Sequence, residues 1–309
     1  MWYSLLIIIL CFIAFERASD YLVEGLGSIS QHFEISEAVL GATIAAMGSS
    51  APEFASSAFS VVENHPTIGL GTIVGSAIFN ITIIVGGSAL IGKYLIKKRL
   101  FYRDGLFYLL TVGVTILGIW DGNISRIEAI FWVILFIVYL SWLIHDAKIG
   151  CPIPKEQFEK TTKRKAIAYI VIGLIIIGVA ARFLIIQVAT LTEAWGISES
   201  IFSLIIVAAG TSVPDFFTSI QAAKKKMGSM AVSNALGSNI FDILASIGIP
   251  FSFRATTSVE TGISISLIGL IVSVGLALFL MRYKWNVTRK DGSLLIGTYV
   301  TYVVLIIMI

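Results

Sequence analysis

Charged residues are scarce in this chain of 309 residues. Lys, Arg, Asp and Glu make up 13% of it, whereas a typical soluble domain carries about 25%. Hydrophobic residues make up 57%, and the mean hydropathy is +0.91. These values exclude an ordinary soluble domain and predict an integral membrane protein. The net charge of +3 is too small to indicate a nucleic-acid partner.

Cysteine and histidine are scarce as well, with two and three residues. Cys11 lies in the first apolar run and Cys151 in a polar loop, so no disulfide framework is expected. The first run also lacks a basic segment before it and a small-residue cleavage site after it. We therefore interpret it as a retained helix rather than a signal peptide.

Apolar runs long enough to cross a bilayer, which takes roughly 20 residues, recur along the whole chain. We expect an all-α integral membrane protein with about ten transmembrane helices joined by short connections. The expected spans lie near 2–26, 37–62, 69–92, 104–120, 126–146, 165–190, 199–222, 228–250, 259–281 and 292–308.

Basic residues in the connections predict the orientation. Those on one side hold eighteen Lys and Arg, whereas the other side holds only Arg126 and Arg254. Because basic loops stay in the cytoplasm, the longest polar segment, 147–164, is expected to be a cytoplasmic linker. With ten spans, both termini are then extracytoplasmic, and the chain is a multi-pass protein of a cell membrane.

An internal repeat organises the chain, with an offset of 162 residues. It relates GSSAPE (48–53) to GTSVPD (210–215), GSAIFN (75–80) to GSNIFD (237–242), and ISE (35–37) to ISE (197–199). We expect a first five-helix repeat in 1–146 and a second in 165–309. Five is an odd number, so the second copy starts on the opposite face of the membrane. Inverted repeats of this kind are typical of secondary transporters with a site at the bilayer midplane.

The proline motifs 48–53 and 210–215 each place a proline, two hydroxyls and a carboxylate inside an apolar run. The proline interrupts the helix, and freed backbone at membrane depth must be buried in protein or line a cavity. An intramembrane carboxylate is a functional hypothesis by default. A kinked helix with an incidental buried acid is the alternative, and it is disfavoured because the motif occurs twice in register. Oxygen donors with no nearby His or Cys favour hard cations such as Na⁺ and Ca²⁺.

The glycine motifs 75–80 and 237–242 allow close helix approach at Gly75 and Gly237. In each motif the serine and the last residue are four apart, so each pair shares a helix face. We expect the spans that carry the proline and glycine motifs, numbers 2, 3, 7 and 8, to be broken helices. For Asn239, a purely structural interhelical hydrogen bond stays open beside a role in the site.

Three acids, Glu53, Asp215 and Asp242, are then expected to converge. Carboxylates a few Å apart repel, so they need protons or cations. If two different cation loads compete for the same oxygens and the empty site is costly to carry across, the protein is an exchanger rather than a channel. An intramembrane aspartyl protease built on Asp215 and Asp242 is another class, but it would leave Glu53 without a role. We therefore do not expect an enzyme.

These motifs resemble the two repeats of the calcium/cation antiporter superfamily, and specifically the sodium/calcium exchangers and their potassium-dependent branch. The resemblance is dense over 37–92 and 199–250. It implies a Na⁺/Ca²⁺ antiporter that alternates access by sliding helices one and six over the other eight. It also implies the cation ligands, which include two backbone carbonyl groups: Glu53, Asp215, Ser49, Ser50, Thr211, Ser212, Ser76, Asn80, Ser238, Asp242, and the carbonyls of Ala46 and Ala208.

Two details concern the counter-ion. Proton-coupled relatives carry asparagine where this chain has Ser50 and Ser212. A Ca²⁺/H⁺ antiporter is therefore the alternative, and Na⁺/Ca²⁺ exchange is the leading prediction. Asp242 and the spelling GSSAPE are typical of the potassium-dependent branch, and co-transport of K⁺ stays open. The resemblance implies no cofactor and no obligatory protein partner besides the transported ions and the bilayer.

Other charged residues lie near the expected membrane surface. Asp20 and Arg182 are repeat-related, and we expect them to snorkel or to pair with Glu16, Arg17 or Glu24 rather than to act as gating charges. The stretch 63–65 is expected to be a solvated turn before Pro66.

Overall fold

The chain folds almost entirely into helices. The computed structural model describes residues 2–32, 46–148, 161–224, 228–255 and 261–308. In the first half it contains α1 (Trp2–His32), α3 (Ala46–Ser49), α4 (Ala51–Val62), α5 (Pro66–Phe79), η2 (Asn80–Ile84), α6 (Val85–Ile91), β1 (Tyr94–Leu95), α7 (Lys98–Leu100), η3 (Phe101–Gly105), α8 (Leu106–Ile119) and α9 (Arg126–Lys148).

The second half is helical in the same way. It contains α10 (Lys163–Trp195), α11 (Glu199–Phe202), η4 (Ser203–Val207), α12 (Ala208–Thr211), α13 (Val213–Lys224), α14 (Gly228–Phe241), η5 (Asp242–Ile247), α15 (Gly248–Phe253), α16 (Thr261–Lys284), β2 (Asn286–Val287) and α17 (Arg289–Ile307). The segments η2 to η5 are π-helical.

Seven helices in the described part of the chain are long and apolar enough to cross a membrane, and the bent pair 199–211 and 213–224 makes eight. Two of the ten expected spans remain. The run 2–26 lies within the 31-residue helix α1, and the span 37–62 begins outside the described residues. The chain is thus an all-helical, multi-pass integral membrane protein.

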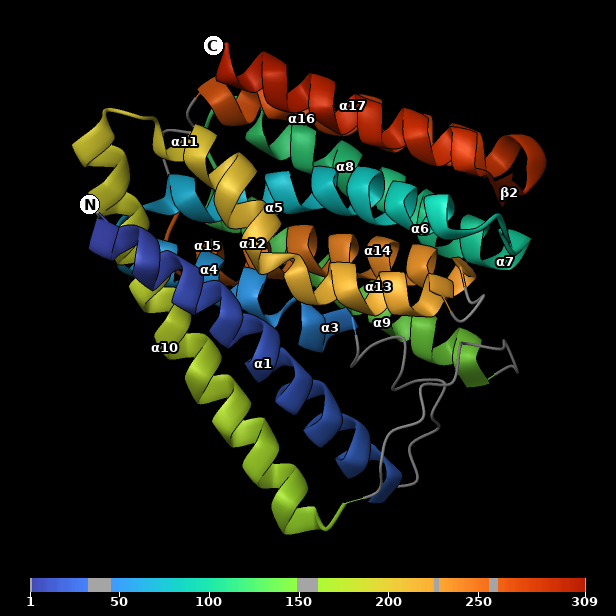
Figure 1. Cartoon of the computed structure of the whole chain (residues 1–309), viewed down its shortest axis with the longest axis horizontal. Coiled ribbons are helices and arrows are strands. Elements are labelled where there is room, and N and C mark those ends of the chain that lie inside the picture. Colours follow the sequence, from blue (N-terminus) through green and yellow to red (C-terminus); the bar gives the residue numbers. More distant parts are fainter. Residues whose placement is uncertain (1, 33–45, 149–160, 225–227, 256–260, 309) are drawn as a thin grey trace.

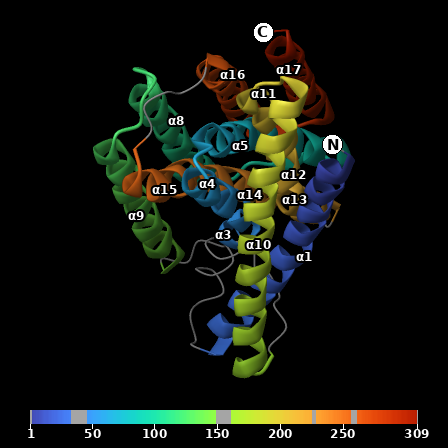
Figure 2. The same cartoon turned by 90° about the vertical axis from the view of Figure 1, so that its left-hand side faces the viewer.

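Helices α1 and α10 form a pair of their own. They pack along each other and extend together beyond the remaining helices (Figure 2). Their apolar residues form one buried cluster with a few residues of α4, α5, α11 and η4, whereas a second and larger cluster fills the rest of the bundle. Two separate cores indicate that the pair is packed against the bundle rather than woven into it.

The two ends of the bundle are distinct. Strands β1 and β2 pair antiparallel, with Tyr94 opposite Val287, so the connections before α7 and before α17 lie at one end. Both ends of the chain lie at the opposite end (Figure 1). The strand pairing therefore brings together the connections 92–97 and 285–288, which were predicted to lie on the same side of the membrane.

The expected breaks in spans 3 and 8 take the form of π-helical turns. The helix from Pro66 to Ile91 is continuous, and its π segment begins at Asn80. The helix from Gly228 to Phe253 has a π segment that begins at the repeat-related Asp242. A π turn inserts an extra residue into the helix, and here it does so at the last residue of each glycine motif.

Candidate functional site

Both proline motifs interrupt their helices at a serine. α3 ends at Ser49 and α4 begins at Ala51, and the same interruption lies at Ser212, between α12 and α13. Ser50 has φ −88° and ψ 7°, and Ser212 has φ −79° and ψ 4°. The near-identical angles indicate that the two copies of the motif bend the backbone in the same way, because a proline follows two residues later in each.

Asp215 lies at the centre of one polar group. Its Oδ1 accepts hydrogen bonds from Ser49 Oγ, from Asn234 Nδ2 at 3.2 Å and from Ser238 Oγ at 3.2 Å. Its Oδ2 accepts one from Ser50 Oγ at 3.5 Å. Two of these donors come from the first proline motif, so the second repeat's carboxylate is held by the first repeat's hydroxyls.

Glu53 receives the reciprocal contact. Ser212 Oγ lies 3.1 Å from Glu53 Oε1 and 2.9 Å from Ser76 Oγ, and Ser76 Oγ lies 3.4 Å from Asp242 Oδ2. Each proline motif therefore places a hydroxyl on the carboxylate of the other motif. The expectation that Glu53, Asp215 and Asp242 come together in one polar region matches this geometry.

The remaining predicted residues lie in the same region. The hydroxyl of Thr211 points back to the carbonyl oxygens of Val207, at 3.1 Å, and Ala208, at 3.2 Å. The Ala208 carbonyl also accepts the Ser212 backbone N–H, and the Ala46 carbonyl accepts the Ser50 N–H and the Ser49 hydroxyl. A cation at either carbonyl would have to share it with these donors.

Three oxygens of the site are buried and have no hydrogen-bond partner among the residues that the structure describes. They are Glu53 Oε2, Asn80 Oδ1 and Asp242 Oδ1, and the three side chains are fully buried. A buried polar atom without a partner is rare and unfavourable by about 1–3 kcal/mol or more. Unpaired acceptors on side chains from both repeats are what a site for a bound cation requires.

Acidic side chains do not surround an ion by themselves. Within the described residues, no group of three His, Cys, Asp or Glu side chains is placed to hold a metal ion. The hydroxyls of Ser212 and Ser76 link Glu53 to Asp242, and Asp215 accepts hydrogen bonds from the hydroxyls of Ser49, Ser50 and Ser238. Any cation here would therefore need hydroxyl, amide or carbonyl oxygens as well, which suits Na⁺ or Ca²⁺ and not zinc.

The two glycine motifs approach their neighbours differently. A Cβ added to Gly75 would lie 2.2 Å from the carbonyl oxygen of Leu204, so only glycine lets α5 pack this closely on η4. At the repeat-related Gly237 the nearest atom would be the Cβ of Ala46 at 3.6 Å. Close approach was expected at both glycines, and it is tight only at Gly75.

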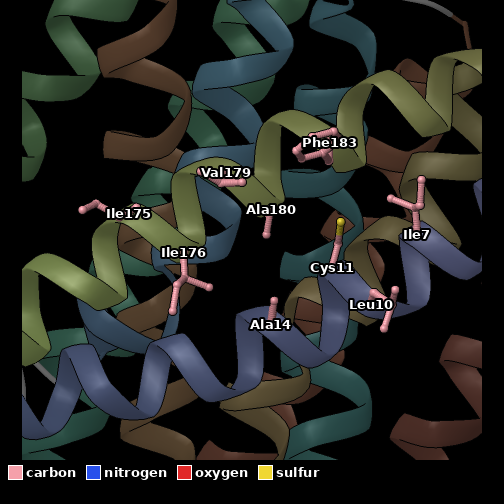
Figure 3. Close-up of a pocket in the computed structure, with 9 residues that line it drawn as sticks. All are labelled: Ile7, Leu10, Cys11, Ala14, Ile175, Ile176, Val179, Ala180 and Phe183. Atoms are coloured by element: carbon pink, nitrogen blue, oxygen red, sulfur yellow. The ribbon is translucent and has the colours of Figure 1, made fainter.

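The crevice between α1 and α10 is a different feature (Figure 3). It has a volume of about 540 Å³, and it is lined by Ile7, Leu10, Cys11, Ala14, Ile175, Ile176, Val179, Ala180 and Phe183. All nine residues are apolar or weakly polar, and none belongs to the site. The site itself is buried in the bundle behind α1, whose Phe12 ring covers Gly210.

Asn234 and Tyr108 contact the site and were not predicted. Asn234 donates to Asp215 and lies four residues before Ser238, on the same helix face, so its spacing could have revealed it. Tyr108 lies on α8, 131 residues from Asn239, with which it forms a hydrogen bond of 2.9 Å. Its repeat-related position is Leu270, so neither the repeat nor local spacing points to it.

An ion pair and a hydrogen bond lie near the turn at 63–65. Arg182 Nε on α10 lies 2.8 Å from Glu63 Oε1, and His65 Nδ1 lies 2.7 Å from Glu199 Oε1. The expected partners of Arg182 were wrong, because its guanidinium reaches across to the end of α4 instead of staying near α1. The turn itself forms as predicted, with Asn64 at φ 67°.

Comparison with known proteins points to one family. The sodium/calcium exchanger protein family model matches residues 3–145 and 165–308. An uncharacterized membrane protein of Methanocaldococcus jannaschii is 31% identical over 284 residues, which cover 91% of each chain. Sodium/potassium/calcium exchanger 4 of Mus musculus is 36% identical over 151 residues, which cover 48% of this chain and 23% of that protein.

A solved structure has the same fold. The sodium-calcium exchanger NCX_Mj, soaked with 2.5 mM Na⁺ and 10 mM Sr²⁺, matches with a TM-score of 0.70 and 27% sequence identity. The match covers 98% of each chain. The similarity therefore extends over the whole bundle and not only over the motifs.

Proposed function

The chain belongs to the sodium/calcium exchanger protein family, a family of cation exchangers, and from this premise we propose that it exchanges Na⁺ for Ca²⁺ at a site between its two proline motifs. The observation that carries the proposal is the set of unpaired buried oxygens on Glu53, Asn80 and Asp242. These oxygens belong to both repeats and lie in one hydrogen-bonded region with Asp215.

The charge of the site supports transport of cations. Glu53, Asp215 and Asp242 are fully buried, and every hydrogen bond described above for their carboxyl groups comes from a hydroxyl or an amide. Unpaired carboxylates are very unfavourable in a medium of low dielectric constant. One divalent ion would neutralise two of the three negative charges and three monovalent ions would neutralise all of them, and the two loads would compete for the same oxygens. An empty site would remain costly to move, which couples one load to the other.

The packing supports alternating access. The buried cluster of α1 and α10 includes only a few residues of the other helices, and α1 covers the second proline motif through Phe12. We propose that this pair slides over the remaining helices and exposes the site first on one side and then on the other. Since the larger cluster of the bundle includes no described residue of α1 or α10, such a movement would change the contact of Phe12 with Gly210 and leave the core of the bundle intact.

The counter-ion is proposed to be Na⁺. Serine at positions 50 and 212 puts neutral hydroxyls on the two carboxylates of the proline motifs, and hydroxyl oxygens are ligands for Na⁺. NCX_Mj, which shares the fold, is a sodium-calcium exchanger. K⁺ is proposed as a possible third ion because of the acid at Asp242, and the match to a sodium/potassium/calcium exchanger covers 48% of the chain.

Both termini are proposed to be extracytoplasmic.

The experiment is uptake of radioactive calcium by liposomes that contain the purified protein. Vesicles are loaded in turn with Na⁺, with K⁺, or with a buffer that creates a pH step, and then diluted into calcium. Uptake that requires internal Na⁺ supports the proposal. Uptake driven by the pH step instead would establish Ca²⁺/H⁺ exchange, and uptake with no counter-ion would indicate a channel.

Glu53→Gln is the matched variant, because it keeps the size of the side chain and removes its charge. It should abolish calcium uptake while the protein still purifies as a folded species. Glu128→Gln is the control, since the Glu128 carboxylate bonds to Ser125 at the exposed start of α9, away from the site. Equal uptake by both variants would exclude Glu53 as a ligand.

A further inference from the structure

A chain of hydrogen bonds runs from α8 to the site. Asn239 Nδ2 donates to the hydroxyl oxygen of Tyr108 at 2.9 Å and to the carbonyl oxygen of Ala77 at 3.0 Å. Asn80 Nδ2 donates to Asn239 Oδ1 at 3.0 Å. The side chains of Tyr108, Asn239 and Asn80 are fully buried. We infer that Asn239 is a positioning residue that holds the Asn80 amide with its oxygen, and not its NH₂ group, toward the cation site, an inference that rests on the proposed function.

The orientation of both amides follows from a single acceptor. The backbone carbonyl of Ala77 has no hydrogen to donate, so Asn239 must present its NH₂ group to it. The oxygen of the Asn239 amide then faces Asn80, and it too can only accept. Asn80 must therefore turn its own NH₂ group toward Asn239. The partners of the two amides therefore determine which atom of each is nitrogen.

The fixed orientation leaves the Asn80 oxygen free. Asn80 Oδ1 is buried and has no hydrogen-bond partner in the described part of the chain, in common with Glu53 Oε2 and Asp242 Oδ1. The Asn80 NH₂ group also lies 3.4 Å from Ser76 Oγ, which in turn lies 3.4 Å from Asp242 Oδ2. Rotation of the Asn80 amide by half a turn would replace an acceptor in the site by a donor, which repels a cation.

The repeat explains why this pair of hydrogen-bonded asparagines occurs in one copy and not in the other. The residue related to Asn80 is Asp242, whose carboxylate presents an oxygen in either orientation and needs no fixing. The residue related to Asn239 is Ala77, which supplies only the backbone carbonyl that anchors Asn239. An asparagine meant only to join helices would have no reason to differ in this way between the copies.

The test compares calcium binding by purified variants, measured by titration calorimetry, with transport in liposomes. Asn239→Ala frees the Asn80 amide to rotate. Loss of a group that orients a metal ligand typically lowers metal affinity about 10- to 100-fold, so the calcium dissociation constant and the KM for uptake should rise by at least about 10-fold. The maximal rate should change much less.

Because Asn239→Ala also removes the hydrogen bonds to the Tyr108 hydroxyl and the Ala77 carbonyl, a second background separates positioning from stability. In Asn80→Asp the carboxylate offers an oxygen in both orientations and has no hydrogen for the Asn239 oxygen, so adding Asn239→Ala should not lower calcium affinity below that of Asn80→Asp alone. If the loss is the same in both backgrounds, Asn239 acts only as a structural link and the inference is overturned.

A matched pair of tyrosine variants adds an independent readout. Tyr108→Phe removes one of the two acceptors that hold the Asn239 NH₂ group, and it should weaken calcium binding about 3-fold, the order of half of one hydrogen bond. Tyr302→Phe removes an equally buried bond, from the Tyr302 hydroxyl to Ser266 Oγ at 3.0 Å, between α16 and α17. It should leave calcium binding unchanged. Equal effects would contradict the inference.

The outcomes distinguish this inference from the proposed function. If the wild type and the variants show the expected differences in calcium affinity but the wild type shows no sodium-driven uptake, the positioning role stands and the proposed exchange fails. If uptake is driven by sodium but Asn239→Ala binds calcium as the wild type does, the exchange stands and the positioning role fails. If the wild-type protein binds neither Ca²⁺, Sr²⁺ nor Na⁺, both fail.

Discussion

Asp215→Asn should change ion affinity and protein stability in different directions. Three of the four described hydrogen bonds to the carboxylate end on Oδ1, from Ser49, Asn234 and Ser238, and only the 3.5 Å contact from Ser50 ends on Oδ2. An asparagine can keep Oδ1 in place and put its NH₂ group where Oδ2 was. The variant should therefore fold, with at most one long hydrogen bond lost.

The ion, in contrast, loses a unit of negative charge. Two unit charges 4 Å apart interact by about 4 kcal/mol at an effective dielectric constant of 20, and for a divalent ion the value doubles before desolvation is considered. Since 1.4 kcal/mol corresponds to a factor of ten, calcium affinity should fall at least about a thousandfold. Sodium affinity should fall less, because Na⁺ carries half the charge.

The assay is calorimetric titration of calcium together with thermal unfolding in ion-free buffer. We expect no detectable calcium binding and a Tm that is no lower than that of the wild type, because one buried acid has been removed. Asp291→Asn is the control, since Asp291 forms the capping box of α17 with Thr288, away from the site. Calcium binding within tenfold of the wild type, or a variant that loses stability in ion-free buffer, would refute the reasoning.

Three further results are expected. Gly210→Ala should slow exchange, because its Cβ would lie 2.3 Å from the ring of Phe12 and overpacking of this kind costs about 1–3 kcal/mol; adding Phe12→Ala should restore part of the rate, and uptake assays that show no rescue would count against this contact. Arg182→Glu should lower the Tm slightly by placing two acids together, and adding Glu63→Arg should restore it, since a half-exposed pair contributes under about 1 kcal/mol; a Tm that stays low in the double variant would contradict the pairing. Calcium at one hundred times its Kd should stabilise the protein by about 2.7 kcal/mol, and saturating Na⁺ should reduce this gain because the ions compete; additive gains in a thermal-shift titration would mean separate sites.

Much of the site could be predicted because two repeats share one register. The 162-residue offset paired GSSAPE with GTSVPD, and two inverted copies must meet near the bilayer midplane. That reasoning brings Glu53 and Asp215 together. It did not predict that a hydroxyl of each motif bonds to the carboxylate of the other motif, which the structure shows. Helical spacing alone placed Ser76 on the face of Asn80.

The remaining features depend on packing that no local pattern encodes. Tyr108 reaches Asn239 from a helix far away in the sequence, and only the folded bundle brings them together. The π turns at Asn80 and Asp242 shift the helix face by one residue, which a regular helical period does not predict. Arg182 reaches Glu63 because α10 crosses α4, a packing relation that charge and hydropathy do not reveal.

The central claim is that one cation is bound between the two repeats by oxygens of both. The most direct measurement is a structure determined with Sr²⁺ in place of Ca²⁺, in which the heavier ion is located by its own anomalous scattering. The account predicts an ion within about 2.3–2.6 Å of its oxygen ligands, the range known for Ca²⁺, among them the presently unpaired oxygens of Glu53 and Asp242. An ion held by residues of one repeat alone, or found outside this polar region, would contradict it.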